Sequence, residues 1–136
     1  REAERRAAPL FERFGLAEFE GARTWELSGG MRQRVAFLRT VLTGRPLLAL
    51  DEPFGALDSI TRAQMQEWLI GALKNEPRTL LLVTHNLAQA RRLATHCACL
   101  WAEEGGSVLR DLGPTERVFT EQPDAALRDW LSGRIG

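Results

Sequence analysis

The sequence predicts an α/β fold built on a short parallel sheet, and three features indicate it. Residues 47–51 and 79–84 are apolar runs with the length of buried strands. Between them, residues 60–73 place apolar side chains at helical intervals, which completes a right-handed strand–helix–strand unit. A Ser-Gly-Gly sequence at 28–30 opens a further amphipathic helix shortly before the first strand. Each expected element follows from the residues in turn.

The first expected element is an amphipathic helix over residues 1–14. Its apolar residues recur at helical intervals among charged ones, at Ala3, Ala7, Leu10, Phe11 and Phe14. Pro9 is a point at which this helix could be interrupted, because proline lacks the N–H that an internal helical bond needs. Gly15 is expected to end the helix, and residues 16–26 to connect it to the next one.

Residues 28–42 are expected to form a helix whose first turn can bind an anion. Ser28 is a favourable N-cap residue, and Gly29 and Gly30 let a phosphate approach the backbone without a Cβ in the way. Unpaired N–H groups and the positive end of the helix dipole face outward at such a start. The apolar face is expected to hold Met31, Val35, Leu38 and Leu42, and the helix to close at Gly44.

The strand at 47–51 is expected to deliver two carboxylates, Asp51 and Glu52, to the carboxyl end of the sheet. Its Leu-Leu-Ala-Leu run suits a strand that is buried on both faces. Ligands of open α/β sheets bind at this end of the strands, where a carboxylate can hold Mg²⁺. Alone, an apolar run that ends in Asp-Glu is a weak signal. Behind a Ser-Gly-Gly helix start, it indicates a metal–nucleotide site.

The next helix is expected to lead back to the same end of the sheet. It runs from about Ile60 to Leu73 and has Asp58-Ser59 as its N-cap. Its core stripe consists of Met65, Trp68, Leu69, Ala72 and Leu73. The strand 79–84 then ends at His85. A lone histidine is usually structural or solvated, but a strand end beside two carboxylates makes His85 a candidate functional residue.

Beyond His85 the sequence predicts a helix capped by Asn86 and then a β-hairpin. Strands at 97–101 and 107–112 flank a Glu-Glu-Gly-Gly turn. Two helices are expected to follow, one opened by Pro114 and one over residues 124–131.

The two cysteines, Cys97 and Cys99, are expected to be buried free thiols. They lie two residues apart on one strand and therefore share a face. A metal site completed by His96 is the alternative, but two sulfurs and one imidazole leave tetrahedral zinc one ligand short.

Composition limits the function classes. With 136 residues and 44% hydrophobic content, the chain can form one domain or part of one. Its 18 basic residues balance 18 acidic ones, so it lacks the electrostatic footprint of a nucleic-acid or anionic-membrane binder. Because no window reaches 18 apolar residues and no signal peptide opens the chain, we expect any membrane role to come through a partner.

Four motifs, in order and at family spacing, resemble the ATP-hydrolysing subunits of ABC transporters. Residues 27–34, Leu-Ser-Gly-Gly-Met-Arg-Gln-Arg, resemble the ABC signature, and residues 47–53 resemble the Walker B strand. Residues 55–58, Gly-Ala-Leu-Asp, resemble the D-loop, and Thr84-His85 resembles the H-loop. The amino-acid sequences of these motifs are most similar to those of bacterial importer ATPases of the nitrate, sulfonate, taurine and thiamine-precursor group.

The resemblance implies a P-loop NTPase-like fold of the ABC ATPase type, with a parallel sheet and part of the helical subdomain. It divides residues 1–136 into the helical subdomain with the signature helix (1–45), the Walker B to H-loop core with the hairpin (46–112) and carboxyl-terminal helices (113–136). The family's phosphate loop is absent, because the only lysine, Lys74, is not followed by a hydroxyl residue. We therefore expect an incomplete domain, the carboxyl-terminal part of a longer protein, that is inactive alone.

The resemblance also implies an activity, namely ATP hydrolysis between two such domains arranged head to tail. Asp51 would bind Mg²⁺, Glu52 would be the general base, and His85 would contact the γ-phosphate. The implied nucleotide-binding residues are Ser28, Gly29, Gly30, Gln33 and Asp58, with Asp58 also bridging the two domains. ATP and Mg²⁺ are thus the expected cofactors.

The implied partners are transmembrane permease subunits and a second ATP-binding domain, as a homodimer, on the cytoplasmic face of the inner membrane. No nucleic-acid partner is expected. One alternative is a soluble ABC-type ATPase acting on DNA or ribosomes, which would normally bring basic surfaces or long insertions. The other is a regulatory ABC protein without turnover, which would not need Glu52 and His85. The transported substrate is not encoded here, because selectivity in importers resides in other subunits.

Overall fold

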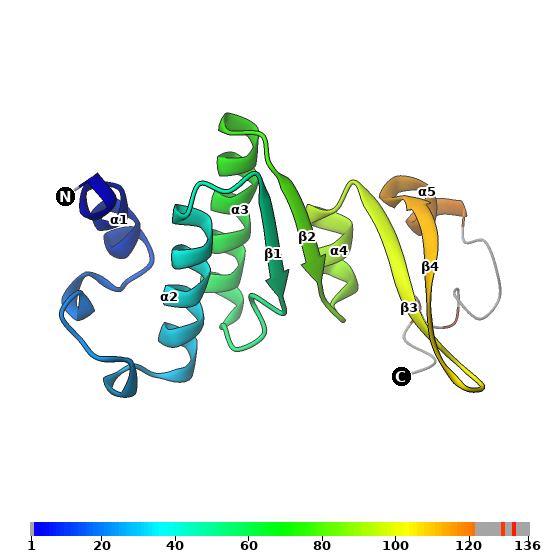
Figure 1. The fold of residues 1–136 in the computed structure, drawn as a ribbon, viewed down its shortest axis with the longest axis horizontal. Helices are drawn as coiled ribbons and strands as arrows, with labels where there is room; N and C mark the ends of the chain where they lie inside the picture. The colour runs from blue at the N-terminus through cyan, green and yellow to red at the C-terminus, as the bar shows by residue number, and fades with distance from the viewer. Residues whose placement is uncertain (1, 122–128, 130–131, 133–136) are drawn as a thin grey trace. The chain divides into compact units, whose positions relative to one another are not determined.

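The computed structural model describes residues 2–121, 129 and 132, which form two compact units (Figure 1). The first unit is Arg1–Val83 and the second is Thr84–Gly136. The first contains α1 (Glu2–Arg13), two 3₁₀ turns (Ala17–Phe19 and Thr24–Glu26), α2 (Gly29–Leu42), β1 (Leu47–Asp51), α3 (Ser59–Asn75) and β2 (Thr79–Val83). The second contains α4 (Leu87–Leu93), β3 (His96–Glu103), β4 (Gly106–Pro114) and α5 (Thr115–Glu121). The mixed α/β class is confirmed, while the predicted division at residues 45 and 112 stays a prediction.

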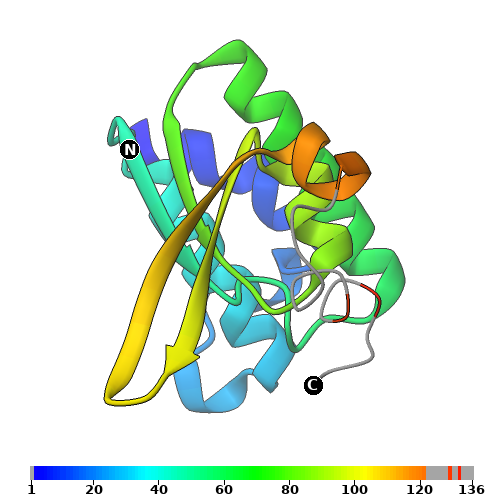
Figure 2. The same cartoon turned by 90° about the vertical axis from the view of Figure 1, so that its right-hand side faces the viewer.

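In the first unit, β1 and β2 form a two-stranded parallel sheet joined through α3, as predicted. The register pairs Leu48 with Leu80 and Asp51 with Val83. Figures 1 and 2 both show α3 on one side of the strands. Leu48 and Leu50 are accordingly buried, at 1% and 6% exposure. The alternate residues of β1 are exposed in the described chain, so the prediction of a strand buried on both faces is wrong for this structure.

Four aromatic rings connect the elements of this unit. Phe37 of α2 lies 5.7 Å from the ring of Phe54, which follows β1, and 5.9 Å from the ring of Trp68 in α3. Trp68 also contacts Phe14, edge to face, at 5.6 Å. Such pairs contribute about 0.5–1.5 kcal/mol each beyond the burial of their area. The loop after β1 is therefore anchored to α2 through Phe54, which is fully buried, and Phe37 in turn joins α2 to Trp68 of α3.

The ends of α2 follow the sequence, but of the four residues expected on its apolar face only Leu38 is fully buried. Ser28 is the N-cap, and Gly44 adopts the left-handed conformation (φ +68°) just beyond the helix, where a side chain would be strained. The buried residues are Phe37, Leu38 and Val41, whereas Met31, Val35 and Leu42 are half-buried. Phe37 is buried because it packs against Phe54 and Trp68. The helical period of α2 alone does not specify these two partners.

α1 runs without interruption through Pro9. The break that the sequence allowed therefore does not occur. A proline costs one internal helical hydrogen bond, and the neighbouring turns of this 12-residue helix remain helical around it.

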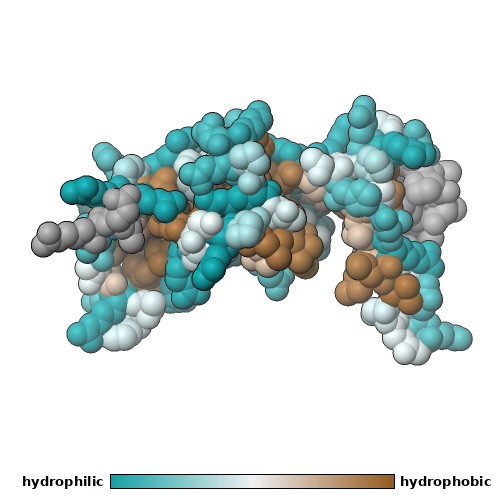
Figure 3. Space-filling view, turned by 45° about the horizontal axis from the view of Figure 1, so that its top comes forward, coloured by the Kyte–Doolittle hydropathy of each residue, from teal (hydrophilic) through white to brown (hydrophobic). Residues whose placement is uncertain are grey.

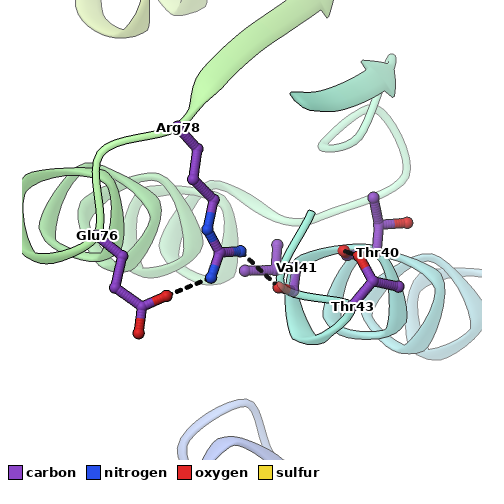
Figure 4. A network of polar contacts seen from close by, with 5 residues as sticks. All are labelled: Thr40, Val41, Thr43, Glu76 and Arg78. Atoms are coloured by element: carbon purple, nitrogen blue, oxygen red, sulfur yellow. Dashed lines mark hydrogen bonds and ion pairs between the residues drawn. The ribbon is translucent and has the colours of Figure 1, made fainter. Parts of the chain in front are cut away.

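Arg78 ties the start of β2 to the end of α2 (Figure 4). Its side chain is only 11% exposed, and its Nη1 donates to the carbonyl of Val41 at 2.8 Å. Its Nη2 pairs with the carboxylate of Glu76. The amide of Thr79 donates to the carbonyl of Pro46 at 2.8 Å, which joins the first residue of β2 to the residue that precedes β1. These contacts set the register from which both strands run toward the candidate site.

The second unit is a hairpin with two short helices, seen in another orientation in Figure 2. β3 and β4 pair antiparallel with a bulge between Cys97 and Ala98, and both strands are longer than predicted. α5 begins directly after Pro114, as expected. The helix predicted at 124–131 falls largely outside the described residues.

The cysteines of this unit are free but only half-buried, so the expected burial is incomplete. Cys97 Sγ lies 3.3 Å from Thr115 Oγ1. His96 Nε2 lies within hydrogen-bond distance of Asp111 Oδ1 across the hairpin, at 2.6 Å. In the part of the chain that the structure describes, no three potential ligands cluster as a metal site.

Apolar surface is visible on both units in Figure 3. Exposed large side chains include Leu47, Leu81 and Val83 of the parallel sheet and Leu100 and Leu109 of the hairpin. None of the helices in residues 2–121 combines the length and the apolar character needed to cross a bilayer.

Candidate functional site

The first turn of α2 has the features of a phosphate-binding helix start. Ser28 Oγ accepts from the amide of Met31 at 3.2 Å, and the Ser28 carbonyl accepts from the amide of Arg32 at 2.9 Å. The hydroxyl proton of Ser28 therefore remains able to donate to a ligand. Within residues 2–121, the amides of Gly29 and Gly30 donate to no backbone acceptor. This turn thus offers N–H and O–H donors at the positive end of a 14-residue helix.

β1 brings Asp51 and Glu52 to its carboxyl end. Asp51 is the last residue of the strand and is exposed, while Glu52 is half-buried. The amide of Glu52 continues the ladder by donating to the carbonyl of Val83 at 2.9 Å. Glu52 is also the one non-glycine residue with positive φ, +42°, in the part of the chain that the structure describes. This left-handed conformation costs roughly 1 kcal/mol for a side chain with a Cβ, so the surrounding contacts must hold it.

Gln33 of α2 supplies two of those contacts. Its Nε2 donates to the carbonyl of Glu52 at 2.7 Å, and its Oε1 accepts from the amide of Ala56 at 2.8 Å. The carbonyl of Glu52 also accepts from the amide of Gly55, at 3.2 Å. The sequence assigned Gln33 to the nucleotide site, and the structure shows both ends of its amide engaged by the backbone of the loop after β1.

Asp58 ends that loop and starts α3. One of its carboxylate oxygens accepts from the amides of Ile60 (3.1 Å) and Thr61 (2.9 Å). Hydrogen bonds from Thr61, first through its side chain and then through its backbone, hold the pKa of Asp58 below its ordinary value of 3.8. Arg62 Nη2 donates to the carbonyl of Leu57 at 2.7 Å and fixes the turn from the next helix. The predicted cap is confirmed.

Gly30 shows how closely α2 and this loop approach each other. A Cβ on Gly30 would lie 3.3 Å from the carbonyl oxygen of Ala56, closer than most side chains pack. The structure therefore brings six predicted residues, all but Asp51 and His85, onto α2 and the loop that it contacts. Asp51 immediately precedes that loop.

His85 belongs to the second unit and is exposed there. Its neighbours form a small polar network. Thr84 Oγ1 accepts from the amide of Asn86 at 3.0 Å and donates to Gln89 Oε1 at 3.1 Å. Asn86 caps α4 by accepting from the amide of Gln89 at 3.1 Å, as predicted. Gln89 is 4% exposed. The backbone on both sides of His85 is thereby held by side chains of its own unit.

The donor chemistry fits the expected ligands. A serine hydroxyl and two backbone amides at a helix start suit a phosphate, and the Asp51 carboxylate is an oxygen ligand of the kind Mg²⁺ prefers. A cavity of about 590 Å³ lies elsewhere in the first unit, beside Leu10, Trp68 and Arg78, and none of the candidate residues lines it.

Sequence reasoning missed the contacts that support this site from behind, although it had assigned Gln33 itself to the nucleotide site. Phe54 and Leu57 anchor the loop by burial, and Gln33 and Arg62 hold its carbonyls. The burial of Phe54 had a signal, since an aromatic residue lies between the two turn residues Pro53 and Gly55. The partners of Gln33 had none, because its contacts span 19 and 23 positions of sequence.

The chain is similar in sequence to ATP-binding proteins of bacterial importers. A family model described as "ABC transporter" matches residues 2–55. The formylaminopyrimidine import ATP-binding protein ThiZ of Halalkalibacterium halodurans is 52% identical over 94 residues, which cover 69% of this chain and 38% of that protein. The taurine import ATP-binding protein TauB of Rhizobium johnstonii is 44% identical, covering 92% of this chain and 48% of TauB. The aliphatic sulfonates import ATP-binding protein SsuB 1 of Rhodococcus jostii is 44% identical, covering 92% and 50%.

The fold also has a solved counterpart. A structure titled as an inward-facing conformation of a putative metal-chelate type ABC transporter matches with a TM-score of 0.65 at 22% identity. The match covers 93% of this chain and 47% of that one. This chain therefore spans about half the length of the relatives it matches, and the likeness to the solved structure supports the fold alone.

The cap of α3 predicts a pH dependence of stability. Because the folded-state pKa of Asp58 is lowered, its contribution is present above the unfolded-state pKa and is lost as pH falls through the folded value. Asp58→Ser keeps a capping oxygen without a titrating group, so it should flatten the acid side of the curve of Tm against pH. Asp58→Ala should lower Tm at neutral pH as well. Thermal unfolding between about pH 2 and 6 measures this, and identical slopes for wild type and Asp58→Ser would contradict it.

Proposed function

This chain belongs to the ABC transporter family, and from that membership we propose that it binds and hydrolyses ATP to power substrate import. One observation carries the proposal. The donor-rich start of α2 contacts, through Gln33 and Gly30, the loop that follows Asp51 and Glu52. Groups suited to a phosphate and groups suited to bind Mg²⁺ and to activate a water are therefore parts of one packed unit.

In the proposed reaction, the start of α2 holds a γ-phosphate. Ser28, Gly29 and Gly30 direct donors away from the helix, so they can contact ATP that is bound by a second, head-to-tail domain. The charge that develops on the phosphoryl oxygens during transfer is stabilised by such preorganised donors. This domain thus contributes to hydrolysis at its partner's ATP.

Asp51 and Glu52 have separate proposed roles at the other nucleotide. Asp51 holds Mg²⁺, mostly through water, because this small cation keeps most of its hydration shell. Glu52 accepts a proton from the water that attacks the γ-phosphorus. The half-buried position of Glu52 and its held backbone are suited to a base that must keep one orientation.

His85 and Asp58 are proposed to report the state of the nucleotide. His85 contacts the γ-phosphate, so the loss of that phosphate removes a contact. Asp58 links the two domains across their interface, and its exposed position after the D-loop turn is compatible with this role. Loss of the γ-phosphate contacts would then loosen the dimer and move the transmembrane partners.

The proposed partners are transmembrane permease subunits and a second copy of the ATP-binding domain, with no nucleic acid involved. The protein would be peripheral, on the cytoplasmic face of the inner membrane. Relatives named for taurine, sulfonate and formylaminopyrimidine import support an importer, and they differ in the substrate that they name.

Removal of the proposed base should separate binding from hydrolysis. In a complete ABC ATP-binding domain that carries this chain, Glu52→Gln should retain ATP binding and slow hydrolysis by about 100-fold or more. Single-turnover hydrolysis measures the chemical step directly. Glu104→Gln, an exposed glutamate of the hairpin turn, is the matched control and should behave as wild type. A Glu52→Gln rate within about tenfold of wild type would sink the assignment.

A substitution at the start of α2 should test the action in trans. In the Glu52→Gln background, Ser28→Arg should leave nucleotide binding by the monomer nearly intact and abolish the ATP-dependent dimer, because arginine fills the space meant for the γ-phosphate. Size-exclusion chromatography with ATP gives the readout. Ser107→Arg, at an exposed serine of the hairpin, controls for the added charge. An undiminished dimer peak for Ser28→Arg would count against the head-to-tail arrangement.

The 136 residues alone should neither hydrolyse ATP nor bind it more tightly than about millimolar, since they contain no phosphate loop. The exposed apolar side chains of the parallel sheet should also promote self-association. Calorimetric titration with Mg-ATP and light scattering measure both properties. Micromolar binding by a monomer would show that other residues make the nucleotide site.

A further inference from the structure

Gln33 occupies an unusual position between the two functional parts of the first unit. It lies in the second turn of α2, a few residues after Ser28 and Gly29, and its side chain reaches the backbone that follows β1. The Nε2 group donates to the carbonyl of Glu52 at 2.7 Å, and Oε1 accepts from the amide of Ala56 at 2.8 Å. One side chain thus binds both ends of a five-residue loop segment.

The residue at the start of that segment is the one that needs such support. Glu52 has a φ of +42°, where a side chain is disfavoured and from which the backbone would relax if released. The amide of Glu52 donates to the carbonyl of Val83 at 2.9 Å, and this bond holds the peptide before its Cα. The peptide that follows the Cα needs a separate restraint. On that side the carbonyl of Glu52 accepts from Gln33 and, less closely, from the amide of Gly55 at 3.2 Å.

We propose that Gln33 is a positioning residue that fixes the orientation of the Glu52 carboxylate and couples it to the first turn of α2. This rests on the proposed function, in which Glu52 is the base. Because the amide of Gln33 is engaged at both ends by backbone, its contribution is to geometry and not to direct contact with the nucleotide. A carboxylate carried on a relaxed backbone would move away from the attacking water.

The coupling follows from the packing around the same loop. Gly30 approaches the carbonyl of Ala56 so closely that a Cβ would sit 3.3 Å from it, and 3.7 Å from a methyl carbon of Leu57. Together with the two Gln33 bonds, this makes the first turns of α2 and residues 52–57 one rigid piece. A phosphate that engages Ser28 at one nucleotide site would therefore hold in place the base that serves the other.

The test uses two substitutions at position 33 in a complete ABC ATP-binding domain that carries this chain. Gln33→Leu has similar size and removes both hydrogen bonds, and it should lower kcat by about 10- to 100-fold with little change in KM for ATP. Gln33→Glu keeps an acceptor for the amide of Ala56 but loses the donor to Glu52, so its kcat should fall between those of wild type and Gln33→Leu.

Arg34→Gln is the matched control on the same helix. Arg34 Nη1 donates to the carbonyl of Phe14 at 2.5 Å, so this variant also loses a tertiary hydrogen bond of α2, but to a different segment. It should lower Tm and change kcat by less than about threefold. Equal kcat losses in Gln33→Leu and Arg34→Gln at equal Tm losses would reduce Gln33 to a general structural role and overturn the proposal.

Two further readouts separate this inference from the proposed function. In the Glu52→Gln background, Gln33→Leu should change the residual rate of ATP hydrolysis by less than about twofold, because Gln33 acts through Glu52. Additive losses of kcat in the double variant, or a raised KM with unchanged kcat in Gln33→Leu alone, would overturn the inference. Amide hydrogen exchange at Ala56 and Leu57 should accelerate in Gln33→Leu and not in Arg34→Gln, a result that needs no activity. Unchanged hydrogen exchange would overturn the positioning role of Gln33. A wild-type domain without ATPase activity would instead overturn the proposed function.

Discussion

The parallel pairing of β1 with β2 is the constraint on which the candidate site of the first unit depends. Asp51 ends β1 opposite Val83 of β2. The amide of Glu52 makes one more hydrogen bond of the ladder, to the carbonyl of Val83. Because the pairing ends there, the chain turns, and Phe54 is buried in the core against Phe37 of α2. A shift of register by one residue would exchange the buried Leu48 and Leu50 for exposed neighbours and move both carboxylates.

Short polar side chains at helix starts are the second recurring device. Ser28, Asp58 and Asn86 each cap a helix by accepting from an amide two or three residues later. Each also lies at or beside a motif residue. Satisfying the first amides of a helix locally orients the preceding loop, so the same hydrogen bonds that stabilise α2, α3 and α4 also set the backbone on which the functional groups stand.

One face of the parallel sheet in the first unit carries exposed apolar side chains. Leu47, Leu81 and Val83 are each more than half exposed, although an apolar run of this kind is typical of strands covered on both sides. The curated relatives are about twice as long as the aligned chain. The composition of β1 and β2 is therefore typical of strands in a larger sheet, and the strand pattern predicted a burial that the exposed alternate residues do not show.

The sequence alone determined the elements and the motif residues, because both depend on local rules. Neighbouring residues determine the helical period, the caps Ser28 and Asp58, and the strand end at Asp51. The structure contains these helices, both caps and the strand end. Tertiary structure decided what joins these parts. The Gln33 bonds, the Arg78 contact with Val41 and the aromatic chain through Phe37 link residues 17 to 37 positions apart. No local pattern encodes such pairs, since their partners are chosen by packing after the elements have formed.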